Sequence, residues 1–170
     1  MPYFSNKTND PAVDGYARTG GQLFAQTLET LYGLVAELEV DVVQNVPGRL
    51  GRMGELLGES IRAYQAAADV ASPEPTDLTD TPAFGEPELV PLVDAAERLG
   101  MSVRAFSDRD IYIATVEFLM PIRDLVDEAR ESRNVDFLAI REIIRAATRA
   151  QEVSLAATGV MTGLYRGDYA

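Results

Sequence analysis

Residues 21–46, GQLFAQTLETLYGLVAELEVDVVQNV, carry the pattern that decides the fold. Apolar side chains recur there at alternating intervals of four and three residues, at Phe24, Leu28, Leu31, Val35, Leu38 and Val42. An α-helix has 3.6 residues per turn, so this spacing places all these side chains on one face. Leu23 and Leu34 widen the face, which favours a helix within a bundle over a two-stranded coiled coil.

Two further helices are predicted before residue 101. One runs from the turn at Asn45–Gly48 to about Ala71, because Pro47 suits the first helical position. Its predicted buried face holds Leu50, Met53, Leu57, Ile61, Tyr64 and Ala68. A short helix should end at Leu99, since Gly100 suits the left-handed residue that follows a helix.

Two long helices are predicted in the remaining chain. Ser107 is the expected N-cap of the first, with Asp110 completing a capping box. Its core face would hold Ile111, Ala114, Phe118, Ile122, Leu125 and Ala129. Asn134 should begin the last helix, whose core face would hold Ile140, Ile143, Ala147, Ala150, Val153, Ala157, Val160 and Leu164.

Together these segments predict an all-α fold, an antiparallel helical bundle of four to five helices. Residues 1–20 are rich in Asn, Asp, Gly and Pro, so they are predicted to form an extended N-terminal arm with at most a short helical turn from Pro11. Residues 21–170 are predicted to form the bundle domain. The segment 72–87, SPEPTDLTDTPAFGEP, carries four prolines and is predicted to be a crossover loop.

Composition excludes several kinds of chemistry. The chain has neither Cys nor His. Disulfides, thiolate or imidazole metal sites, cysteine nucleophiles and a Ser-His-Asp triad are therefore impossible within it. We expect no cofactor and no catalytic residues.

The net charge of −12 repels phosphate backbones and anionic lipid headgroups, so we expect no nucleic-acid partner. No stretch approaches 18 uninterrupted apolar residues, so we expect no membrane insertion. The first residues lack the pattern of a signal peptide, which favours a cytoplasmic or virion-associated protein.

Two sets of residues are candidates for contact with a partner. Arg141, Arg145 and Arg149 recur at four-residue intervals and form a basic stripe on the last helix. The stripe is either a docking surface for an acidic partner or a solvated face that pairs with neighbours such as Glu142 and Glu152. Tyr3 and Phe4 stand in a polar arm, and such aromatic residues usually pack on their own bundle or on another subunit.

Anion binding is a further hypothesis. In the segment 47–52, PGRLGR, Arg49 and Arg52 stand at a predicted helix N-terminus, where backbone N–H groups favour anions. A corner between two helices accounts equally for this segment, since it lacks the lysine and the preceding strand of a phosphate-binding loop.

We therefore expect a non-enzymatic helical assembly, structural or adaptor protein that acts through homo-oligomer or protein-partner interfaces. The small residues at 51–58 and 147–157 support this expectation, because they would suit close packing against another copy. An alternative is a Mg²⁺-dependent all-α nucleotide pyrophosphohydrolase, whose metal would bind carboxylates of the 37–41 and 124–131 segments. A third is a ligand-binding sensor bundle, which would need a cavity.

Overall fold

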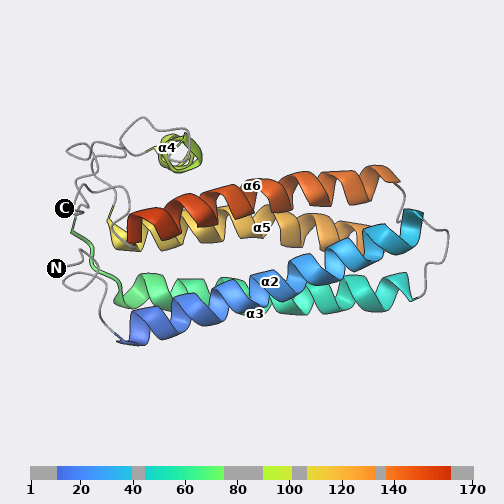
Figure 1. Cartoon of the computed structure of the whole chain (residues 1–170), viewed down its shortest axis with the longest axis horizontal. Coiled ribbons are helices and arrows are strands. Elements are labelled where there is room, and N and C mark those ends of the chain that lie inside the picture. Colours follow the sequence, from blue (N-terminus) through green and yellow to red (C-terminus); the bar gives the residue numbers. More distant parts are fainter. Residues whose placement is uncertain (1–10, 40–44, 75–89, 101–106, 133–136, 162–170) are drawn as a thin grey trace.

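The computed structural model describes residues 11–39, 45–74, 90–100, 107–132 and 137–161. The helices in these ranges are α2 (Pro11–Glu39), α3 (Val46–Val70), α4 (Val90–Arg98), α5 (Asp108–Ser132) and α6 (Phe137–Met161). The four long helices lie side by side and alternate in direction, as Figure 1 shows. The predicted all-α antiparallel bundle is thereby confirmed.

The long helices pack in the order α2, α3, α5, α6, and α2 touches α6 only slightly. The short helix α4 lies at one end of the bundle, against α6 and α5. Figure 1 shows α4 end-on while the long helices run across the view, so α4 crosses their direction. Within the described residues, no helix is both long enough and apolar enough to cross a lipid bilayer.

The core is formed by the faces that the apolar spacing predicted. On α3 the predicted positions are all buried: Leu50, Met53, Leu57, Ile61, Tyr64 and Ala68. On α2, Leu31 and Leu34 are buried while Leu28, Val35 and Leu38 pack against the core from its edge. On α6, Ile140, Ile143, Ala147, Ala150 and Val153 are buried, so the small residues at 147 and 150 pack within this chain's own bundle.

The first helix starts earlier than predicted. It begins at Pro11, so residues 11–20 belong to α2 and not to an arm, and Val13 is buried in the core. Gly20 lies against α3, where a Cβ on it would stand 2.8 Å from ring carbons of Tyr64. The Ser60 hydroxyl donates a hydrogen bond of 2.7 Å to the Gly20 carbonyl. Glycine here permits a close crossing of two helices, whereas the sequence pattern suggested a helix breaker.

The start of α5 has the predicted capping box. The backbone N–H and the hydroxyl of Ser107 both donate to Asp110 Oδ2, each at 2.9 Å. The Asp110 N–H donates in return to Ser107 Oγ at 3.1 Å. These contacts satisfy polar groups that a helix start leaves without intrahelical partners. Gly100 has a φ of 69°, which confirms the left-handed residue predicted after α4.

The end of α3 and the start of α5 are joined by Arg109. Its guanidinium donates to the carbonyls of Ala68 and Ala71, at 3.2 and 3.4 Å. Its backbone N–H donates to the carbonyl of Ser72 at 3.2 Å. The terminal carbonyls of α3 thus gain donors from the next long helix, and the two helix ends are held at the same end of the bundle.

Two glycines of α3, Gly51 and Gly54, face polar side chains of α5. A Cβ on Gly51 would stand 3.7 Å from the Arg130 guanidinium carbon, and one on Gly54 would stand 3.5 Å from Asp127 Oδ1. The space beside these glycines is therefore occupied by side chains of the same chain. This arrangement removes one reason for assigning the glycine face to a contact between copies.

Two stacked tyrosines lie where α3 meets α5. The rings of Tyr64 and Tyr112 have centroids 6.3 Å apart and an interplanar angle of 28°. Burial raises the pKa of the Tyr112 hydroxyl, and the charges of Asp108 and Asp14 raise it further. Burial also raises the pKa of Tyr64, partly offset by its hydrogen bond with Ser154. Both hydroxyls are therefore held in their neutral form in the folded protein.

We expect this pair to make the protein sensitive to alkaline pH. The unfolded chain loses each tyrosine proton near a pH of about 10, whereas the folded chain retains it to higher pH. The stabilisation is thus complete below pH ~10 and declines as the pH rises toward the folded pKa. In urea unfolding between about pH 8 and 11, Tyr112→Phe should show a smaller alkaline loss of stability than the wild type.

Tyr32→Phe is the matched control, because Tyr32 is half exposed on α2. Tyr32→Phe should lose as much stability at alkaline pH as the wild type does. Equal losses in the wild type and in Tyr112→Phe would contradict a role for the buried hydroxyl.

Candidate partner-binding groove

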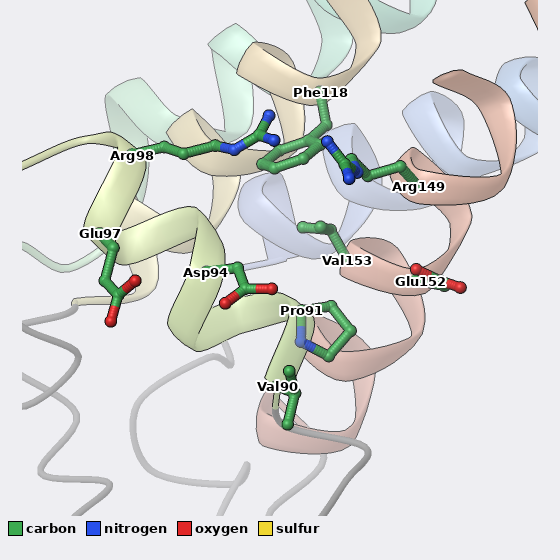
Figure 2. Close-up of a pocket in the computed structure, with 9 residues that line it drawn as sticks. All are labelled: Val90, Pro91, Asp94, Glu97, Arg98, Phe118, Arg149, Glu152 and Val153. Atoms are coloured by element: carbon green, nitrogen blue, oxygen red, sulfur yellow. The ribbon is translucent and has the colours of Figure 1, made fainter. Parts of the chain in front are cut away.

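A line of three adjoining hollows runs along the outside of the α5–α6 pair. The hollow at the α4 end is the α4 pocket, which has a volume of about 580 Å³. It is enclosed by one face of α4, by Phe118 of α5 and by Arg149, Glu152 and Val153 of α6. The pocket exists because α4 crosses the long helices and stands over the seam between them (Figures 1 and 2).

The aromatic ring of Phe118 is the centre of the α4 pocket. The guanidinium carbon of Arg98 lies 5.2 Å from the ring centroid, within the range of a cation–π contact. Arg149 of α6 lines the same pocket, and Figure 2 draws its side chain at the Phe118 end of that pocket. Two positive groups from different helices therefore line one pocket beside Phe118.

Three carboxylates also border the α4 pocket. Figure 2 shows Asp94 between Pro91 and Val153, while the Glu97 and Glu152 carboxylates lie farther from the ring. Within the part of the chain that the structure describes, none of the three lies within ion-pair distance of Arg98 or Arg149. The pocket is thus lined by positive and negative groups that do not pair with one another.

The middle hollow shares Arg98, Phe118, Arg149 and Glu152 with the α4 pocket and has a volume of about 650 Å³. Its wall follows Pro121 and Leu125 on α5, with Ile144 and Ala146 opposite on α6. The last hollow, of about 340 Å³, shares Leu125 and Glu142 with the middle one and ends at Leu138. We call the middle and last hollows together the outer groove. Much of its surface is apolar, and Leu138 is 64% exposed.

The basic stripe of α6 lies beside this groove. Arg145 and Arg149 border the middle hollow, and Arg141 is exposed on the same helix one turn earlier. Arg145 forms an ion pair of 3.4 Å with Glu142, as one of the two interpretations predicted. Both side chains are about half exposed, so the pair contributes only a few tenths of a kcal/mol. Tyr3 and Phe4 lie outside the described residues, and their partner role stays a prediction.

The two arginines of the proposed anion site have partners at the corner between α2 and α3. Arg49 forms an ion pair of 2.5 Å with Glu37 of α2. Arg52 lies 3.9 Å from Glu55, and both of these side chains are mostly exposed. Asn45, with a φ of 55°, caps α3 by accepting a hydrogen bond from the Gly48 N–H at 3.3 Å. These contacts fit a helix corner, and anion binding there stays a prediction.

The carboxylates considered for Mg²⁺ are spread over separate places. Glu37 contacts Arg49, and Asp127 lies beside Gly54 of α3. Across the described ranges, no group of three or more acidic side chains is close enough to hold a metal ion. Asp41 lies outside those ranges.

Sequence reasoning missed Arg98, Asp94 and the site role of Phe118. Phe118 was predicted only as a core residue, and it is indeed 8% exposed. Its role in the pocket depends on where α4 packs, and no periodic pattern in α4 specifies the partner helix. The acidic and basic residues of α4 gave no signal beyond that of an exposed helix face.

No protein-family model matches this sequence, and no curated protein and no solved structure is significantly similar to it.

Proposed function

We propose that the protein is a non-enzymatic assembly or adaptor protein whose outer groove binds a helix of a protein partner. The observation that supports this proposal is the combination of an apolar groove along α5–α6 with a basic stripe at its α6 edge. Amphipathic helices commonly bind in grooves of this kind through side chains at helical spacing.

Charge favours a partner helix with acidic residues along one edge. Arg141, Arg145 and Arg149 are spaced four residues apart, so they recur about every 6 Å along α6. Carboxylates at the same spacing on a helix aligned with α6 would meet them in register. Apolar side chains on that helix would cover Leu125, Ile144 and Leu138.

The interface proposed here differs from the small-residue faces that the sequence suggested. Ala147 and Ala150 face the core of this chain, and α5 side chains lie beside Gly51 and Gly54 of α3. The outer groove remains open in the folded chain, and it presents both apolar surface and a basic edge to solvent.

A synthetic probe tests the proposal directly. The probe is a labelled amphipathic helix of about 18 residues, with Leu on one face and Glu along one edge. We expect saturable binding by fluorescence anisotropy, weakening as salt rises. Arg145→Glu should weaken binding by about tenfold, and Leu138→Ala should weaken it to a lesser degree.

Arg18→Glu is the matched control, because Arg18 is exposed on α2 and the charge change is identical. It should change the affinity far less than Arg145→Glu. Equal effects of the two variants, or no binding of the probe, would contradict a partner site in the outer groove. A dimer that light scattering detects in the wild type but not in Arg145→Glu would instead identify a second copy as the occupant.

A further inference from the structure

The α4 pocket has the size of a small-molecule site. Its volume of about 580 Å³ lies within the range typical of ligand pockets, roughly 300–1,000 Å³. Apolar side chains border it on three helices, with Val90 and Pro91 on α4, Phe118 on α5 and Val153 on α6. Such surfaces can cover the body of a small ligand while a few polar groups orient it.

The two arginines at the ring supply the polar end of the site. Arg98 and Arg149 line the same cavity beside Phe118, and neither forms an ion pair among the described residues. A carboxylate between the two guanidiniums would accept hydrogen bonds from both and would reduce their mutual repulsion. The arrangement is thus complementary to one anionic group attached to an apolar body.

The acidic side chains of the pocket restrict how much negative charge a ligand can carry. Asp94, Glu97 and Glu152 all line the cavity, and Figure 2 shows the Asp94 carboxylate near its middle. A second negative charge on a ligand would approach these carboxylates and be repelled. A monoanion therefore fits better than a dianion or a polyphosphate.

We propose that the α4 pocket binds a monoanionic organic carboxylic acid, with the carboxylate between Arg98 and Arg149 and the apolar body against Phe118, Pro91 and Val153. This site adjoins the outer groove proposed for the partner helix, and Arg98, Phe118, Arg149 and Glu152 border both.

Three related compounds test the proposal on the full chain by NMR titration: phenylacetate, the neutral phenylacetamide and phenyl phosphate, which is mainly dianionic above its second pKa of about 6. We expect phenylacetate to cause saturable shifts of the Arg98 and Arg149 side-chain signals, and to bind at least about tenfold more tightly than either other compound.

Arg149→Gln should weaken phenylacetate binding by about tenfold, and Arg98→Gln should do the same. Arg141→Gln is the matched control on the same exposed stripe, outside the pocket, and it should leave the affinity within about twofold of the wild type. Equal binding of phenylacetamide, tighter binding of phenyl phosphate, or equal effects of Arg149→Gln and Arg141→Gln would overturn the proposal. Absence of saturable phenylacetate binding would overturn it too, and would leave the partner-helix proposal untouched.

Discussion

Leu57→Ala is expected to lower the free energy of unfolding by about 2–5 kcal/mol. Leu57 is fully buried on α3, the helix that packs against both α2 and α5. Truncation would remove apolar burial and would leave a cavity that two neighbouring long helices hold open. Urea unfolding followed by far-UV circular dichroism measures the loss as a lower midpoint with an unchanged slope.

Leu138→Ala is the matched control, because the same atoms are removed from a side chain that is 64% exposed. We expect it to change stability by no more than about 0.5 kcal/mol. If the two alanine variants lost equal stability, the assignment of α3 to the centre of the core would be wrong.

The second large effect is expected at Gly20, where Ala should destabilise the protein by about 1–3 kcal/mol. The added Cβ would stand 2.8 Å from two ring carbons of Tyr64. Since that ring is buried and stacks on Tyr112, it cannot move aside without disturbing α5. Thermal unfolding should therefore show a lower Tm.

The same substitution at Gly33 should raise the stability of the protein. A Cβ on Gly33 would meet nothing within 4 Å, although the residue belongs to the same helix. Ala there should stabilise the protein by about 0.5–1 kcal/mol, because it reduces the conformational entropy of the unfolded chain and favours the helix. Stabilisation at both positions would show that α2 does not cross α3 as closely as described.

The helices and their buried faces were predictable because each depends on local physical rules. The apolar residues of α3 follow helical spacing throughout, and all its predicted core positions are buried. Ser107 and Asp110 are three residues apart, which is the spacing that a capping box requires. Gly100 likewise takes the left-handed conformation that its position after a helix favours.

The pocket was not predictable from the sequence, because it depends on contacts between helices distant in the chain. Arg145 and Arg149 were recognised by their spacing, but nothing local indicated that Arg98 would line one pocket with Arg149. The role of Gly20 could not be predicted for the same reason: position 20 needs a glycine because the Tyr64 ring, on another helix, lies against it. Sequence patterns thus identified residues whose role depends on one helix. They did not identify residues whose role depends on contact between two helices.

The hydrogen bonds of Arg109 to the end of α3 have a consequence for residues 73–108. They hold the end of α3 beside the start of α5, so the segment that includes α4 joins two points that lie close together. The entropy of closing a loop grows only slowly with its length, by about 0.6 kcal/mol for each doubling. Additions or deletions between residues 75 and 89 should therefore be tolerated by the bundle.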